Sequence, residues 1–222
     1  MWADYISFWR DRYPDLLNAT WEHLSISLVA VALGVLVAVP TGIYLSGSRT
    51  KWVQNSIFTI ANLFQTIPSL ALLALLIPLF GIGVKPAIFA LFLYSLLPIL
   101  RNTYAGFQSV DPSILESARG MGYGRTQLLL QIQLPLAFPY IISGIRLTTV
   151  YVISWTALAS LIGAGGLGQL IVSGIGVNKT ELIVSAALCA IMLALLADRA
   201  LGAVEKHFSQ RARSSKSEAS II

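Results

Sequence analysis

The sequence predicts an all-α, polytopic membrane protein with about five transmembrane helices. Of its 222 residues, 56% are hydrophobic and 11% are charged, and the mean hydropathy is +0.75. Soluble domains carry about 25% charged residues, and a water-soluble core could not absorb this much apolar surface. A helix needs about 20 apolar residues to cross about 30 Å of hydrocarbon. Apolar stretches of that size predict spans at residues 24–46, 53–80, 86–104, 137–160 and 181–203.

These spans divide the chain into a membrane domain, residues 24–204, and two flanking segments. Residues 1–23 contain six charged side chains among apolar ones, so they lack the layout of a cleaved signal peptide. Residues 205–222 form a tail that is rich in Ser, Arg and Lys from residue 209 onward, and that part is expected to be disordered.

The stretch 53–80 is too long for one straight span. It contains Pro68 and Pro78, and the polar residues Asn62, Gln65 and Thr66 precede Pro68. Proline breaks or kinks a helix because it removes a backbone hydrogen bond and clashes with the preceding turn. We therefore expect a kink near Pro68, or a division into two short helices.

The distribution of Lys and Arg predicts the topology, because these residues favour cytoplasmic loops. Four of them fall on one side of the five-span arrangement: Arg10, Arg12, Lys85 and Lys179. Ten fall on the other side: Arg49, Lys51, Arg101, Arg119, Arg125, Arg199, Lys206, Arg211, Arg213 and Lys216. The amino terminus is therefore expected outside, and the carboxyl terminus and the loop 105–136 in the cytoplasm. The net charge of +5 lies in short segments between spans, so it does not indicate nucleic-acid binding.

The loop 105–136 contains the signals of a short helix. Asp111 can cap free backbone amides, Pro112 suits the first helical position, and Gly120 or Gly122 can end the helix. Such a helix has two interpretations of similar weight: it inserts into a groove of a partner protein, or it lies on the membrane surface.

One face of this helix is predicted to be apolar. Ile114, Ala118 and Met121 share that face, joined by Leu115. Glu116 and Arg119 lie one turn apart on an adjoining face.

The same loop resembles the coupling motif of ABC importer permeases, which runs Glu-Ala-Ala, three residues, Gly, nine residues, Ile, one residue, Leu-Pro. The matching positions here are Glu116, Ser117, Ala118, Gly122, Ile132, Leu134 and Pro135. Ser117 replaces the first Ala of the motif, a change between small residues. The resemblance implies that residues 112–122 contact a separate ATPase. The residues carried over for this contact are Glu116, Ser117, Ala118, Arg119, Gly120, Met121 and Gly122.

Three further segments resemble the osmoprotectant branch of this family, which imports glycine betaine, carnitine, choline and related quaternary ammonium compounds. They are Gln65–Ala71, Leu97–Tyr104 and Ala157–Ser160, the last followed by a glycine-rich stretch from Gly163 to Gly168. The resemblance covers nearly the whole chain from about residue 20 and implies a bacterial inner-membrane subunit that works by alternating access. The partners it implies are two ATPase subunits, a second permease copy or a sibling permease, an extracytoplasmic substrate-binding protein and membrane lipids.

The chain offers no nucleotide site of its own. Gly163, Gly165 and Gly168 match G-x-G-x-x-G, but they follow a membrane span and not a strand. ATP and Mg²⁺ are therefore expected on the partner ATPase, with no cofactor or metal in this chain, which is a non-catalytic subunit. The glycine turn is instead expected to lead into a re-entrant or interfacial segment at Gln169–Ile175.

Aromatic side chains within spans are candidates for the pathway of a quaternary ammonium cation, because such cations bind aromatic faces. The candidates are Tyr94, Tyr151 and Trp155, with Tyr104 as a further one. Tyr151 and Trp155 are four residues apart and share a helix face. Aromatic residues in spans also pack in cores or anchor at interfaces, so the packing role is the alternative.

Ionisable residues inside spans indicate function by default. Arg146 is expected to extend to the cytoplasmic headgroups, and Asp198 to form a local ion pair or an interface contact. His23 and His207 lie at span boundaries far apart in the topology, and the single Cys189 has no partner for a disulfide. The alternatives left open are a permease for another small solute such as an amino acid, an ion-coupled secondary carrier, and a membrane enzyme.

Overall fold

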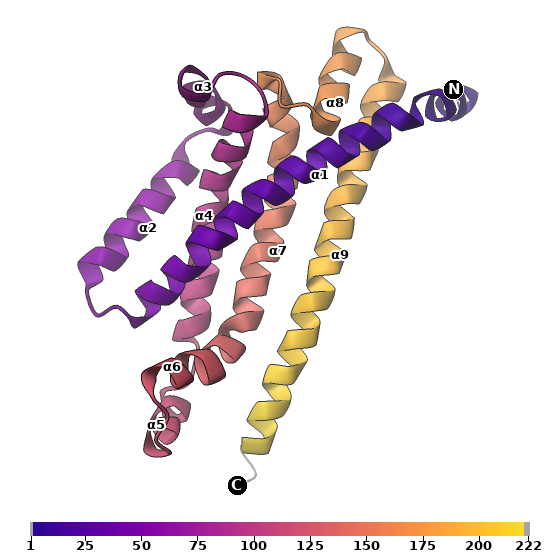
Figure 1. Cartoon of the computed structure of the whole chain (residues 1–222). Helices are drawn as coiled ribbons and strands as arrows, with labels where there is room; N and C mark the ends of the chain where they lie inside the picture. Colours follow the sequence, from indigo (N-terminus) through magenta and orange to yellow (C-terminus); the bar gives the residue numbers. More distant parts are fainter. Residues whose placement is uncertain (1, 220–222) are drawn as a thin grey trace.

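The computed structural model describes residues 2–219, and the side chains of residues 7–209. Four long helices run through the molecule: α1 (Trp2–Gly47), α4 (Val84–Gln108), α7 (Leu134–Ala159) and α9 (Thr180–Ala219) (Figure 1). α1 packs against α4 and α7, and α7 also contacts α4 and α9. The described residues form helices and short connections without any strand, which confirms the all-α fold class.

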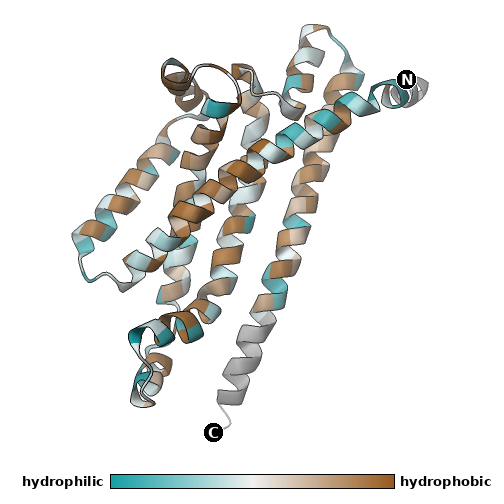
Figure 2. Cartoon of the chain, in the orientation of Figure 1, coloured by the Kyte–Doolittle hydropathy of each residue, from teal (hydrophilic) through white to brown (hydrophobic). Residues whose placement is uncertain are grey.

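The number of spans also agrees with the sequence. Among the described residues, four helical segments are long and apolar enough to cross a membrane, and a bent helix pair gives a fifth. Figure 2 shows that apolar residues dominate the middle of these helices, while polar residues gather toward their ends. The surface that these helices present is therefore suited to lipid or to another apolar helix.

The second span is broken where proline predicts a break. α2 (Lys51–Thr66) and α3 (Ser69–Phe80) meet at an angle of 99°. Ile67 and Pro68 are extended between them, with ψ angles of 129° and 138°. Proline disfavours the helical conformation of the residue before it, so the helix ends at Thr66. Of the two expected arrangements, the division into two helices is the one that the structure adopts.

The first helix is longer than the predicted span. Residues 2–23 do not form a separate segment but continue α1, whose 46 residues correspond to about 69 Å. Hydropathy located the start of the apolar part at residue 24, because the exposed residues Arg10, Asp11, Arg12 and Asp15 interrupt the earlier turns. Charged residues change the hydropathy of a helix without ending it.

The last helix also exceeds its prediction. α9 continues to Ala219, so the expectation of a disordered tail from residue 209 is wrong for residues 209–219. The segment lacks apolar periodicity, but it contains no glycine or proline that would end the helix. Residues 220–222 lie outside the described part of the chain.

The short elements gather at the two ends of the bundle (Figure 1). α3 and α8 (Gly166–Gly176) lie at one end, where α8 packs beside the first part of α1. α5 (Pro112–Gly120) and α6 (Arg125–Gln127) lie at the other end, with the end of α9. α8 is too short to span a membrane, which agrees with the interfacial or re-entrant segment expected at Gln169–Ile175.

Close helix crossings depend on small residues. At Gly34 of α1, an added Cβ would collide with the side chain of Ser95 on α4. At Gly144 of α7, an added Cβ would lie 2.6 Å from the Cβ of Asn102 on α4. Small residues allow membrane helices to approach closely. In lipid the hydrophobic effect does not drive helices together, so their association depends on this close packing. These contacts fix α4 between α1 and α7.

Candidate functional site: the α5 region, the aromatic cluster and the α7–α9 ion pairs

The N-terminus of α5 has the cap that the sequence predicts. The Oδ1 of Asp111 accepts a hydrogen bond from the backbone N–H of Ser113 at 2.9 Å, and Pro112 occupies the first turn. Asp111 has an extended backbone, which is the usual conformation of an N-cap residue. The cap sets where the helix begins relative to the end of α4.

The C-terminus of α5 ends in a left-handed turn at Gly122, where φ is +87°. Gly122 N–H donates to Arg119 O at 3.0 Å, and Tyr123 N–H donates to Ala118 O at 3.1 Å. This hydrogen-bond pair is a Schellman motif, with glycine at the position that requires positive φ. Gly120 is the last helical residue, and of the two glycines that the sequence offered as terminators Gly122 is the one that makes the left-handed turn.

α5 buries one small residue and exposes most of its predicted contact residues. Ala118 is 1% exposed, and α5 packs against the turn that follows α6. The exposed members of the predicted contact set are Glu116, Ser117, Arg119, Gly120, Met121 and Gly122. Met121, which was predicted on the apolar face with Ile114 and Ala118, is 71% exposed. It is the C-cap residue of α5, and its N–H donates to Ser117 O at 3.0 Å.

The segment that supports α5 is a π-helical turn at Leu128–Gln133, followed directly by α7. Pro135 lies in the first turn of α7, and a proline cannot donate to the carbonyl one turn earlier. A π-helical turn places an extra residue in the helix and re-aims the segment on either side of it. Ile132, Leu134 and Pro135 of the motif therefore form the junction between α5 and the α7 span.

The three candidate pathway residues Tyr94, Tyr151 and Trp155 form one aromatic cluster. The Tyr94 and Trp155 rings lie 4.8 Å apart between centroids, and those of Tyr151 and Trp155 lie 5.9 Å apart. Tyr94 is 4% exposed and Tyr151 is 45% exposed, so the cluster extends from the core to the surface of the chain. Tyr104 does not join it, because its ring packs on Phe58.

Tyr94 is also tied to the break in the second span. Its hydroxyl donates to Ile67 O at 2.6 Å, and Gln65 Nε2 donates to Tyr94 O at 2.8 Å. A broken helix leaves backbone carbonyls that need donors within the membrane. The aromatic cluster and the α2–α3 break therefore form one structural unit, which the sequence did not indicate.

Arg146 does not extend to the headgroups as expected. Its Nε and Nη2 donate to the two carboxylate oxygens of Asp198 at 2.6 and 2.8 Å, and its Nη1 donates to Glu205 at 3.1 Å. The expectation is wrong because a bidentate acceptor is available on α9, which lies against α7. Gly202 leaves room for the guanidinium, since an added Cβ would lie 3.1 Å from its Cζ.

The glycine turn before α8 is held by α1. Gly166 N–H donates to Glu22 Oε2 at 3.0 Å, and an added Cβ at Gly166 would lie 3.2 Å from His23. His23 is fully buried, and its Nε2 lies 2.8 Å from Ile153 O on α7. The sequence shows the glycines and the polar residues Glu22 and His23. Which of these residues contact one another depends on how α1 crosses α7.

The sequence also matches a known family of membrane proteins. Residues 30–213 match the family model of the binding-protein-dependent transport system inner membrane component. The chain belongs to this family. The permease is 47% identical over 93% of its length to a carnitine transport permease protein, OpuCB, of Listeria monocytogenes, and covers 94% of that protein.

Other relatives carry related names. The permease is 47% identical to the choline transport system permease protein OpuBB of Bacillus subtilis, over 90% of its length and 92% of that protein. It is 40% identical to the osmoprotectant import permease protein OsmW of Salmonella typhimurium, over 88% of its length and 92% of that protein. A solved structure of the MetNI methionine ABC transporter in inward-facing conformations has a TM-score of 0.79 at 25% identity, covering 87% of the permease and 95% of that chain.

The permease is thus the membrane component of an ABC importer and is located in the inner membrane. Membership of this family implies an ATPase and a substrate-binding protein as partners. Within the described residues, no group of three or more His, Cys, Asp or Glu side chains could hold a metal ion. The sequence did not indicate three features of these sites: the link between Tyr94 and the α2–α3 break, the pairing of Arg146 with α9, and the Glu22–Gly166 contact.

Proposed function

We propose that the permease imports a quaternary ammonium osmoprotectant of the glycine betaine, carnitine and choline class. Support comes from the relatives, whose names specify carnitine, choline and other osmoprotectants at 40–47% identity. The Tyr94–Trp155–Tyr151 cluster supports it chemically, because aromatic faces attract quaternary ammonium ions without a fixed countercharge. Binding by this cluster would be weak, and high-affinity selection would belong to the binding protein.

The ATPase-coupling role is assigned to α5, and its capped, exposed helix is the observation that carries this part of the proposal. Glu116, Ser117, Arg119, Gly120, Met121 and Gly122 form the docking surface, and Ala118 anchors α5 beneath it. Caps at both ends fix the helix, so a displacement of α5 by the ATPase is transmitted to α7 through the π-helical turn. ATP and Mg²⁺ bind the partner subunits, and this chain contributes no cofactor.

The assembly follows from the coupling arrangement. Two ATPase subunits engage two permeases, either two copies of this chain or one copy with a sibling permease. The amino terminus lies outside and the carboxyl terminus in the cytoplasm, as the ten-to-four distribution of Lys and Arg indicates. In that orientation the α3 and α8 end faces the binding protein, and the α5 end faces the ATPases (Figure 1).

The decisive experiment is reconstitution with the cognate ATPase and binding protein in liposomes, followed by uptake of radiolabelled glycine betaine. Uptake should require ATP, and Glu116→Ala should lower the rate of uptake about tenfold. Asp11→Asn, at the other end of the molecule, is the control and should leave ATPase binding unchanged. ATP-driven uptake of methionine in place of betaine would overturn the substrate class and keep the coupling role. Uptake driven by a proton gradient without ATP would instead favour a secondary carrier.

A further inference from the structure

Two basic side chains stand without partners at the turn between α1 and α2. Arg49 and Lys51 are both exposed. Neither forms a hydrogen bond or an ion pair within the part of the chain that the structure describes. Gln108 Nε2 donates to Ser46 O at 3.2 Å, so the turn lies close to the end of α4, on the α5 side of the molecule (Figure 1). The turn therefore presents two positive charges that no described side chain neutralises.

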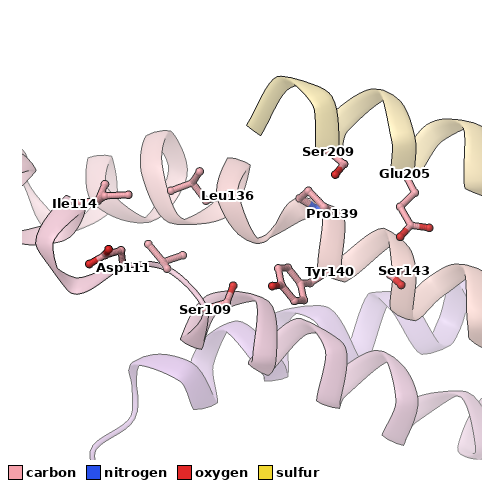
Figure 3. Close-up of a pocket in the computed structure, with 10 residues that line it drawn as sticks. Ser109, Asp111, Ile114, Leu136, Pro139, Tyr140, Ser143, Glu205 and Ser209 are labelled. Carbon is pink, nitrogen blue, oxygen red and sulfur yellow. The ribbon is translucent and has the colours of Figure 1, made fainter. Parts of the chain in front are cut away.

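The carboxylates on this side of the molecule have other roles. Residues 23–110 contain no Asp or Glu. Asp111 and Glu205 line a cavity of about 370 Å³ where α5 meets α7 and α9 (Figure 3). Asp111 caps α5, Glu205 accepts from Arg146 at 3.1 Å, and Glu116 lies on the exposed surface of α5. The two bases of the turn are thus available to an anion from outside the chain.

A narrow apolar groove lies between α1 and α2, with α4 beside both helices. Its volume is about 130 Å³, whereas sites that enclose a small molecule typically measure about 300–1,000 Å³. Val37 and Thr41 line it from α1, Ile60 from α2 and Leu96 from α4. Thr41 carries the only hydroxyl in the lining, and its Oγ1 already donates to Val37 O at 2.6 Å. The groove therefore suits a slender apolar chain and offers no free polar group to a ligand.

The groove lies at the depth of the acyl chains of one membrane leaflet. Along α2 its lining runs from Ile57 to Phe64, about 9 to 20 Å from Lys51. The hydrocarbon of one leaflet is about 15 Å thick, half of the membrane core. Trp52 is 76% exposed beside Lys51, and tryptophan at the end of a span typically lies at the level of the headgroups. A lipid with its headgroup at the turn would thus have its acyl chain alongside the groove.

We propose that the hairpin of α1 and α2 binds an anionic phospholipid. The phosphate lies between Arg49 and Lys51, and one acyl chain lies in the groove. Basic residues next to a membrane surface attract anionic lipids. In the orientation proposed above the turn faces the cytoplasm, so the lipid comes from the inner leaflet. The site goes beyond substrate transport, because the lipid would join α2, the first half of the broken span, to α1 and α4.

A second copy of the permease fits this surface less well. The chain has a net charge of +5. Among the described residues, the exposed acidic side chains are Asp11, Asp15 and Glu22 in the first half of α1, and Asp111 and Glu116 at α5. A second copy would therefore bring few carboxylates to the α1–α2 turn. Charge complementarity favours a lipid phosphate there.

Native mass spectrometry of the full-length permease tests the proposal, with phosphatidylglycerol or phosphatidylcholine of identical acyl chains. The permease is measured alone and assembled with a second permease and the ATPase subunits. The parent should bind the anionic lipid about tenfold more tightly, and Arg49→Gln and Lys51→Gln should each weaken its binding about fivefold. Lys85→Gln is the control, because Lys85 is also exposed but lies at the start of α4, at the other end of the span. It should leave the binding of both lipids unchanged.

A second pair of variants tests the groove. Val37 is 45% exposed at its rim, so Val37→Trp should fill the groove and cause loss of both lipids. Leu36→Trp is the matched control, because Leu36 is 71% exposed and does not line the groove. Its lipid binding should equal that of the parent. Inorganic phosphate lacks an acyl chain, so millimolar concentrations should not displace the lipid.

Four outcomes would overturn the proposal. They are equal binding of the two lipids, unchanged binding of phosphatidylglycerol when Arg49→Gln and Lys51→Gln are combined, equal effects of Val37→Trp and Leu36→Trp, and displacement of the lipid by inorganic phosphate. Lipid on the isolated permease but not on the assembled complex would assign the groove to the second permease instead. Melting temperatures within a few degrees of the parent show that a weakened variant is folded. The assay uses neither substrate nor ATP, so its failure is independent of the uptake result.

Discussion

Arg146 on α7 and Asp198 on α9 form a bidentate ion pair, with Nε–Oδ1 and Nη2–Oδ2 distances of 2.6 and 2.8 Å. Both side chains are about one third exposed on the isolated chain, at 36% and 38%. The pair and the added contact to Glu205 connect two spans that are distant in sequence. A charged pair in an apolar environment is costly to break, since one partner is then left without compensation.

We expect a double-mutant cycle of Arg146→Ala and Asp198→Ala to give a coupling energy of about 1–2 kcal/mol, reduced from the fully buried case by the partial exposure. Thermal unfolding in detergent checks this value. The control is the same cycle at the exposed Arg12–Asp15 pair, 2.8 Å apart, where about 0.2–1 kcal/mol is expected. Equal coupling energies at the two sites would show that the Arg146–Asp198 pair stabilises the protein no more than an exposed ion pair does.

Gly122→Ala should weaken ATPase binding and ATP-driven uptake. The left-handed conformation costs a non-glycine residue about 1–2 kcal/mol, which corresponds to a loss of about five- to thirty-fold if the cap must form for docking. Nothing lies within 4 Å of the added Cβ, so the effect comes from the backbone alone. Gly47→Ala is the matched control, because it also meets open space and has ordinary φ. Copurification of the ATPase measures the effect, and equal losses in both variants would argue against a cap-specific effect.

Gly168→Ala should destabilise the packing of α8 on α7. The added Cβ would collide with the backbone of Ala157, which cannot move without shifting the end of α7. A loss of about 1–3 kcal/mol is expected, as for other overpacked sites. Gly176→Ala, at the end of the same helix and with nothing within 4 Å, should change stability by less than about 0.5 kcal/mol. Thermal melts of the two variants provide the comparison, and similar values would contradict the close contact between α8 and α7.

Tyr94→Phe should separate the structural and the transport roles of the aromatic cluster. It removes the hydroxyl that donates to Ile67 O at 2.6 Å but keeps the ring against Trp155. Loss of a hydrogen bond in a buried setting costs about 0.5–1.5 kcal/mol, so stability should fall while the KM for uptake stays within about twofold. Trp155→Ala should instead raise the KM for glycine betaine severalfold. If Tyr94→Phe changed the KM and Trp155→Ala did not, the Tyr94 hydroxyl and not the Trp155 ring would be assigned to the substrate pathway.

The sequence by itself determined the helical class, the five apolar spans, the break at Pro68 and both caps of α5. These features are local: the length of an apolar run, the missing N–H of Pro68, the carboxylate of Asp111 and the positive φ of Gly122 act within a few residues. Continuity of α1 before residue 24 was missed, because hydropathy measures polarity and not helical geometry.

The tertiary structure alone decided which distant residues meet. Arg146 could have extended to headgroups or paired within the protein, and only the packing of α9 on α7 placed Asp198 within 2.6 Å. In the same way, the crossing of α1 over α7 brought Glu22 to Gly166, and the bend between α2 and α3 brought Ile67 O to Tyr94. Periodicity specifies which face of a helix is apolar, but the partner of that face depends on how whole helices pack. The packing energy is distributed over many small contacts, so no single residue reveals the partner.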